Sequence, residues 1–122
     1  MVQGICDGYG GSFDLDYQFG YPSLQNSPDE TGFVVLAASR FLGAEHVLAD
    51  HKPVLGAEDF AFFAQKVPAA YCFVGCGVAG APVRPLHSGN FDFDERALFV
   101  GAQVMEETAL AALTFLERKK ED

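Results

Sequence analysis

The residue with the clearest capacity for chemistry is His87, in the run Pro85-Leu86-His87-Ser88-Gly89-Asn90. This run forms a loop bounded by proline and glycine, after a short apolar stretch and before a long apolar-periodic segment. A neutral imidazole there is able to ligate zinc, which takes about four ligands. No second His, Asp or Glu stands close by at a spacing such as His-x-x-x-His, so most co-ligands would come from elsewhere. A lone loop histidine is also commonly a surface residue, and this alternative stays open.

A second candidate is the pair Glu58-Asp59, which follows Gly56-Ala57 at the expected start of a short helix. Carboxylates favour helix N-termini because they complement the helix dipole and accept hydrogen bonds from free N–H groups. That structural explanation is sufficient by itself. The functional alternative is a turn that presents a carboxylate or backbone N–H groups to a ligand.

Two cysteines, Cys72 and Cys76, are four residues apart on a predicted strand. A single Cys-x-x-x-Cys is a weak metal signal, because structural zinc sites need about four ligands. Buried free cysteines are common, and we favour that interpretation. A small independent metal domain that uses both thiols together with His87 is a further possibility. No Gly-x-Ser-x-Gly nucleophile motif occurs, and no catalytic nucleophile or base is assigned.

The periodicity of the chain predicts an α/β order of elements. Ser12–Tyr21 alternates apolar and polar residues, which is typical of a strand with one buried face. Ser27-Pro28-Asp29-Glu30 matches a capping box, and the helix that it opens should end near Leu42, before Gly43. A short helix should carry Phe60 and Phe63. A buried strand is expected over residues 70–74, and a long helix should start near Asp92 or Asp94.

Composition limits the classes of function. The chain has 122 residues, 49% of them hydrophobic, with 12 Phe, and this excludes a disordered segment. The formal net charge of -9 argues against nucleic acid and against anionic membranes as partners. The apolar runs look shorter than the ~20 residues of a membrane span. No signal peptide is evident, and three cysteines without a framework spacing suggest a reducing, cytoplasmic location.

Several short motifs in register carry a resemblance to a known family. In chain order, the motifs are Gly20-Tyr21-Pro22, Asn26, Gly56-Ala57-Glu58-Asp59-Phe60, Val67-Pro68, Phe73-Val74-Gly75-Cys76-Gly77, Pro85-Leu86-His87-Ser88 and Phe91-Asp92-Phe93-Asp94-Glu95. Their order and spacing resemble the C-terminal part of the M20 metallopeptidase family. The branch that they resemble includes hippurate hydrolases, N-acyl-amino-acid aminoacylases and auxin-conjugate hydrolases. Each motif alone is weak, and their common register makes the resemblance specific.

The resemblance implies a fold and a division into domains. Residues 1–24 would be the C-terminal end of a ferredoxin-like lid, which is also a dimerisation domain, with Ser12–Tyr21 as its last strand. Residues 25–122 would be the incomplete closing portion of a three-layer α/β catalytic domain with a mixed sheet. Asn26 would lie at the hinge between the two.

The resemblance also implies the site. His87 matches the family's last metal ligand, in a centre of two divalent ions, zinc or manganese. Glu58, with Gly56 and Asp59, would lie on a loop that lines the site. The family's other ligands and its general base do not occur in this chain, so we expect the isolated chain to be inactive.

The leading hypothesis is therefore part of a metal-dependent amidohydrolase that acts on N-acyl amino acids or small peptides. The missing N-terminal portion, or a second copy of the chain, would be its partner. The alternative is a non-enzymatic remnant or interaction module without bound metal.

Overall fold

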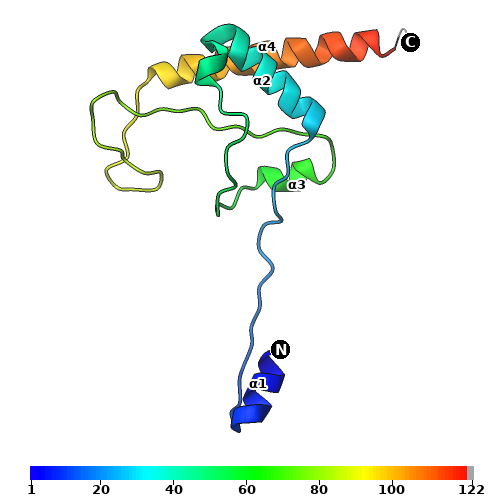
Figure 1. The fold of residues 1–122 in the computed structure, drawn as a ribbon, viewed down its shortest axis with the longest axis vertical. Coiled ribbons are helices and arrows are strands. Elements are labelled where there is room, and N and C mark those ends of the chain that lie inside the picture. The colour runs from blue at the N-terminus through cyan, green and yellow to red at the C-terminus, as the bar shows by residue number, and fades with distance from the viewer. Residues whose placement is uncertain (121–122) are drawn as a thin grey trace.

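The structure is a computed structural model that describes residues 1–120. Its elements are α1 (Val2–Tyr9), α2 (Pro28–Leu42), the short 3-10 helix η1 (Ala44–His46), α3 (Phe60–Ala64) and α4 (Arg96–Arg118). Figure 1 shows α2 and α4 together at one end of the molecule and α1 at the other. Residues 1–120 contain no strand, so the mixed sheet and the two-domain division stay predictions.

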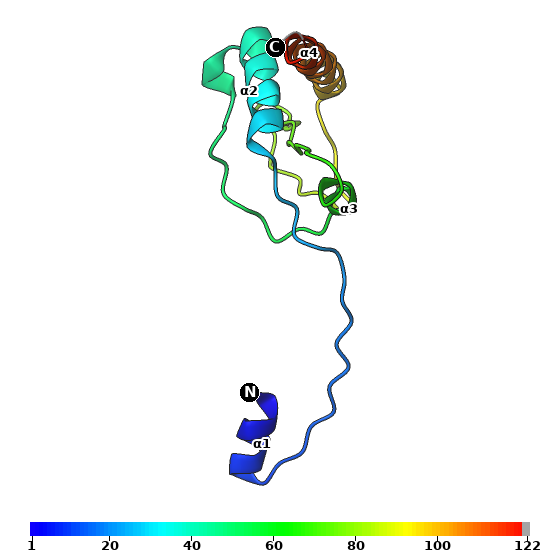
Figure 2. The same ribbon diagram turned by 90° about the vertical axis from the view of Figure 1, so that its right-hand side faces the viewer.

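The centre of the fold is the antiparallel pair of α2 and α4, which lie side by side in Figures 1 and 2. Phe33 contacts Phe115 with ring centroids 5.3 Å apart, and Phe41 contacts Phe99 at 6.0 Å. Between these aromatic pairs, α2 contributes small buried residues. Close approach of two helices requires such residues, because interhelical distance depends on side-chain size at the contact. The buried residues of the pair are Ala37, Ala38 and Val104.

The expected helix after the hinge is confirmed at Pro28–Leu42, with Pro28 in its first turn. The predicted capping box is wrong, because the Ser27 side chain makes no cap hydrogen bond. Instead its Oγ accepts a hydrogen bond from Ala69 N at 3.1 Å. Asp29 and Glu30 in the first turn still complement the helix dipole. Gly43 ends the helix at φ 93°, where a Cβ would lie 2.7 Å from the Glu45 carboxylate.

The two later helices are also confirmed, with different bounds. The short helix is α3, and the long one is α4, which begins at Arg96 just beyond the predicted start. Asp94 fixes that start: its N–H donates to Cys76 O at 2.8 Å, and its Oδ1 accepts from Arg96 N at 3.0 Å. Hydrogen bonds from the Arg96 side chain and backbone lower the pKa of Asp94 to about 2.

By length and composition, α4 is apolar enough to cross a membrane. This qualifies the expectation that no apolar stretch approaches the length of a span. The core helix of a water-soluble domain meets the same criteria. Glu106 and Glu107 lie adjacent in the middle of α4, where charge in a bilayer is costly. We therefore interpret α4 as the partner of α2.

The N-terminal region differs from the expectation. Residues 2–9 form α1, which the sequence pattern did not predict, and residues 11–27 carry no regular structure. The strand expected over Ser12–Tyr21 is not formed in the structure, where this segment projects away from the helical pair (Figure 1). A strand needs a neighbour to accept its ladder hydrogen bonds, and no backbone bond from residues 12–21 occurs in the described part of the chain. A ring contact of 5.7 Å joins Tyr21 to Phe62.

The described residues bury little apolar surface. The buried hydrophobic residues are Ala37, Ala38, Ala61, Ala69 and Val104, and none of them is large apart from the valine. Many large side chains stay exposed, among them Phe73 at 62% and Phe99 at 63%. Exposed apolar surface on this scale is typical of an interface. The chain therefore presents faces suited to covering by other protein segments.

Candidate functional site

Glu58 is a predicted site residue whose side chain is held by hydrogen bonds at both carboxylate oxygens. It is half-buried at the end of an exposed loop, residues 51–57, that leads into α3. Its Oε1 accepts a hydrogen bond from Phe60 N at 3.3 Å, and its Oε2 accepts one from the Tyr71 hydroxyl at 3.0 Å. The Phe60 N–H, then Asp59, then the Tyr71 hydroxyl lower the pKa of Glu58. Glu58 is therefore an oriented anion at neutral pH.

Asn26, the predicted hinge residue, holds the backbone of Tyr71. Its Oδ1 accepts from Tyr71 N and its Nδ2 donates to Tyr71 O, both at 2.8 Å. The side-chain amide thus pairs with the Tyr71 backbone as a peptide group would. Next to it, Ser27 N donates to Ala69 O at 2.8 Å. These bonds join two segments more than 40 residues apart in the sequence.

Sequence reasoning missed Tyr71 as a member of this site. Its hydroxyl donates to the Glu58 carboxylate, and that hydrogen bond, with burial and the nearby negative charge, raises the pKa of the Tyr71 phenol. The available signal was the spacing of two in the apolar run 70–74, which places Tyr71 and Phe73 on one face of an extended segment. Their rings are 5.5 Å apart.

His87 lies in a different loop and is held by its backbone. It is exposed, and it has φ 63°, the left-handed region that non-glycine residues rarely adopt. Turn hydrogen bonds surround it: Ser88 N donates to Pro85 O at 3.3 Å, and Phe91 N donates to Ser88 O at 3.0 Å. An ion pair of 2.9 Å between Arg84 and Asp92 closes the base of the loop. The described residues give the imidazole no hydrogen bond.

The residues of this chain do not by themselves fit a metal. Within residues 1–120, no three His, Cys, Asp or Glu side chains come together as a ligand group. His87, Cys72 and Cys76 therefore do not form the independent metal site considered above. The expectation that both cysteines are buried is wrong, because Cys72 is exposed and Cys76 is half-buried. Partial desolvation of the thiol still raises the pKa of Cys72, which disfavours the thiolate that ligates metals. His87 supplies one donor where about four are needed.

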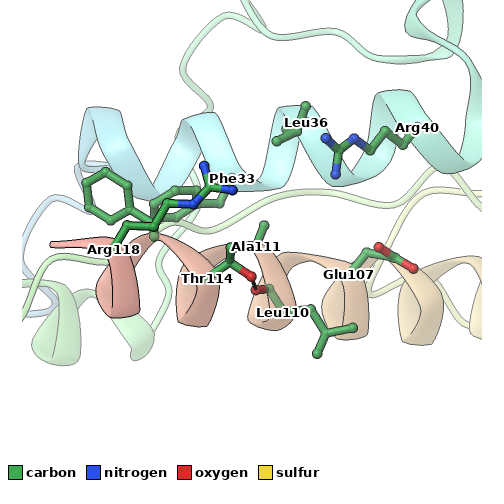
Figure 3. Close-up of a pocket in the computed structure, with 9 residues that line it drawn as sticks. Phe33, Leu36, Arg40, Glu107, Leu110, Ala111, Thr114 and Arg118 are labelled. Carbon is green, nitrogen blue, oxygen red and sulfur yellow. Dashed lines mark hydrogen bonds between the residues drawn. The ribbon is translucent and has the colours of Figure 1, made fainter. Parts of the chain in front are cut away.

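A groove of about 390 Å³ lies between α2 and α4, away from the predicted site residues (Figure 3). Its lining includes the apolar residues Phe33, Leu36 and Phe115 and the charged residues Arg40, Glu107 and Arg118. Figure 3 shows these charged side chains spread along the two helices, without converging on one point. The groove contains none of Asn26, Gly56, Glu58, Asp59 or His87.

Comparison with known proteins decides the family. The sequence profile of Peptidase family M20/M25/M40 matches residues 3–111. The chain belongs to this family. Its M20 assignment agrees with the resemblance carried by the motifs around Asn26, Glu58 and His87. No solved structure gives a significant match.

Three curated relatives of this M20 chain illustrate the range of the family. YhaA of Bacillus subtilis (strain 168), an amidohydrolase by name, is 36% identical over 120 residues, which cover 94% of this chain and 28% of YhaA. Thermostable carboxypeptidase 1 of Saccharolobus solfataricus is 35% identical over 104 residues, 84% of this chain and 25% of that protein. N-acetylcysteine deacetylase of Bacillus subtilis is 32% identical over 113 residues, 93% of this chain and 28% of that protein.

The M20 chain therefore spans between a quarter and a third of the length of these relatives. Their names describe hydrolases of amide bonds, and this supports amide hydrolysis as the chemistry of the group. The site residues described above are one part of what a relative of full length contains.

Proposed function

We propose that this chain forms the part of a metal-dependent amidohydrolase that carries one metal ligand, His87, and one substrate-facing loop with Glu58. The complete enzyme would cleave the amide bond of an N-acyl amino acid or a small peptide. The observation that carries the proposal is the family match over residues 3–111, together with relatives named for amide hydrolysis.

The geometry supports distinct roles for the two loops. Glu58 is ionised and oriented, with each carboxylate oxygen accepting one hydrogen bond. Such a group is suited to orient a hydrogen-bond donor or a cationic group of a substrate. Gly56 and Asp59 lie on the same loop. His87 presents an exposed imidazole on a backbone fixed by turn hydrogen bonds.

Two divalent ions, zinc or manganese, belong to the enzyme that we propose, and His87 would be the donor from this chain. The other donors and the general base would come from protein that this chain does not contain, either the missing N-terminal portion or a second copy. Because the residues present do not hold a metal alone, we assign them no step at the ion. We expect the 122-residue chain alone to be inactive.

The test is a chimera in which this chain replaces the matching 28% of YhaA. We expect the purified chimera to release free amino acid from N-acyl amino acids when zinc or manganese is supplied, and to lose this activity with a chelator. The matched sample is the 122-residue chain alone, for which no release is expected. A folded, metal-loaded chimera with no activity on any N-acyl amino acid or dipeptide would contradict the proposal.

One observation favours the alternative of an interaction module: the chain exposes large apolar side chains on α4 and on residues 73–86. A module would form a stable, specific oligomer that lacks metal. Light scattering after size-exclusion chromatography, with elemental analysis of the same peak, separates the two. A defined dimer without metal, combined with an inactive chimera, would favour the module.

We propose a cytoplasmic enzyme, since the three cysteines have no spacing typical of a disulfide framework. Cys6, Cys72 and Cys76 are all free thiols in the structure. Free thiols are typical of reducing compartments.

A further inference from the structure

Tyr71 lies between two segments that are distant in the sequence and that both belong to the proposed site. On one side, its backbone N–H and C=O are both hydrogen-bonded to the Asn26 amide at 2.8 Å. On the other side, its hydroxyl donates to Glu58 Oε2 at 3.0 Å. One residue thus connects the segment before α2 to the loop before α3.

The phenol ring is fixed in a way that suits this connection. Phe60 lies 5.9 Å away and Phe73 lies 5.5 Å away, centroid to centroid, on either side in the sequence. A ring held by its backbone and by two aromatic neighbours loses little further entropy when its hydroxyl makes a bond. The bond is to an ionised carboxylate, and charge-assisted hydrogen bonds are stronger than neutral ones.

We propose that Tyr71 is a positioning residue for the Glu58 carboxylate, and that the Asn26 side-chain amide sets the backbone of Tyr71 so that its hydroxyl reaches Glu58. The inference deepens the proposed function and rests on it, since it concerns the same site loop. Tyr71 itself need not touch substrate. Its contribution is to remove rotamer freedom from Glu58 before substrate binds.

The competing explanation is that Tyr71 only packs. Its ring would then stabilise α3 through Phe60, and the hydroxyl would be incidental. Tyr71→Phe separates the two explanations, because it keeps the ring and removes only the hydrogen bond. Other ionisable groups near the pair are Asp59 beside Glu58 and Cys72 beside Tyr71, and both stay unchanged in this variant.

The first experiment follows the Glu58 side-chain carboxyl carbon by NMR as the pH is changed, in the whole 122-residue chain. In Tyr71→Phe we expect the apparent pKa of Glu58 to rise, because the ionised form loses a donor. Tyr9→Phe is the matched control, since Tyr9 is 91% exposed and donates no hydrogen bond in the described structure. An unchanged Glu58 pKa in Tyr71→Phe, with an otherwise wild-type amide spectrum, overturns the proposal.

The reciprocal experiment follows the Tyr71 phenol carbon in Glu58→Gln. A coupling between two sites acts equally in both directions, so the pKa of Tyr71 should fall when the carboxylate is replaced by a neutral amide. An unchanged Tyr71 pKa overturns the proposal. This experiment decides the matter if Tyr71→Phe fails to fold.

The consequence for catalysis is tested in the YhaA chimera described above. We expect Tyr71→Phe to lower kcat/KM by about 10-fold or more, in line with the cost of misplacing a reacting or binding group. The acid limb of the pH profile should move to higher pH in the same variant. If the hydrogen bond is present but both readouts are unchanged, the positioning role is overturned. If the chimera is inactive, the proposed function fails, and the two NMR experiments still decide whether Tyr71 orients Glu58.

Discussion

Glu58 and His87 are the two loop residues most closely tied to the proposed site, and the structure fixes them by opposite means. The Glu58 side chain is held by hydrogen bonds from Phe60 N and the Tyr71 hydroxyl. The His87 side chain accepts and donates none within the described residues, whereas its backbone is held in the left-handed region at φ 63°. One site residue is oriented through its functional atoms, and the other through its main chain.

The difference indicates which contacts of Glu58 and His87 this chain supplies itself. Glu58 has its partners within residues 26–71, so its orientation is a property of this chain. The His87 imidazole makes no hydrogen bond within residues 1–120, which suits a residue whose contacts come from other protein or from a bound ion. A metal-ligating histidine normally donates its second ring N–H to a carboxylate or carbonyl. That partner would also come from outside the described residues.

Removal of the His87 imidazole should reduce activity most. In the YhaA chimera, His87→Ala should lower kcat/KM by more than about 100-fold, because loss of a ligand should exceed the 10- to 100-fold cost of losing a residue behind a ligand. Metal content measured on the same protein should fall. His46→Ala is the control, since the His46 side chain is 66% exposed and its only ion pair within residues 1–120 is with the neighbouring Glu45. Unchanged tight metal binding in His87→Ala would remove His87 from the site.

The second prediction concerns the support of Glu58. Asn26→Ala removes two hydrogen bonds to the Tyr71 backbone, each worth about 0.5–1.5 kcal/mol net. We expect the free energy of unfolding to fall by about 1–2 kcal/mol, measured by urea titration. Gln25→Ala is the matched control, because Gln25 is the exposed neighbour and makes no side-chain hydrogen bond in the described structure. Equal stabilities of the two variants would show that the amide does not hold Tyr71 in solution.

The third prediction concerns the left-handed backbone conformation of His87. At position 87, glycine should be more stable than alanine by about 1 kcal/mol, since only glycine adopts a positive φ without steric cost. Both variants lack the imidazole, so urea titration of His87→Gly against His87→Ala isolates the backbone term. At Leu86, where φ is not positive, the order should reverse, with alanine above glycine. The same order at both positions would argue that the left-handed conformation at His87 is absent in solution.

The smallest expected effect concerns the ion pair that closes the His87 loop. Arg84 and Asp92 are 45% and 61% exposed, and exposed pairs contribute about 1 kcal/mol at most. A double-mutant cycle of Arg84→Ala and Asp92→Ala should give a coupling energy below about 0.5 kcal/mol at 0.15 M salt, decreasing as salt is added. A larger coupling that resists salt would mean that this pair, more than the turn hydrogen bonds, sets the His87 backbone.

The helices were predictable because their signals are local. Pro28 and Gly43 bracket α2 as their backbone preferences dictate, and Pro68 lies beyond α3. The capping box failed because a long-range donor competes with the local one: Ser27 Oγ accepts a hydrogen bond from Ala69 N, 42 residues away, and no local pattern encodes that choice. Residues 2–9 were missed because two glycines lie within that stretch and lower its intrinsic helix propensity.

In the site, too, local sequence motifs were predictive and long-range contacts were not. Motif register singled out Asn26, Glu58 and His87, and the structure describes their surroundings, but their roles in catalysis stay predictions. Tyr71 was invisible to motif reasoning because its importance depends on contacts with Asn26 and Glu58, 45 and 13 residues away. The left-handed backbone at His87 was also not predicted, since positive φ is uncommon at any non-glycine residue, even at histidine, where it is enriched. The sheet stays a prediction, because residues 1–120 contain no strand and a ladder needs a neighbouring strand to accept its hydrogen bonds.

The hydrogen bonds between the Asn26 amide and Tyr71 also affect how readily Asn26 is deamidated. Asparagine followed by a small residue such as serine loses its amide nitrogen when the next backbone N attacks the side-chain carbonyl carbon. Here Ser27 N donates to Ala69 O, and both ends of the Asn26 amide are engaged by Tyr71. The attacking nitrogen and its target are therefore both restrained. Conversion of Asn26 to aspartate should therefore require unfolding of this region. The added mass on the peptide that contains Asn26 then reports how often these hydrogen bonds have broken.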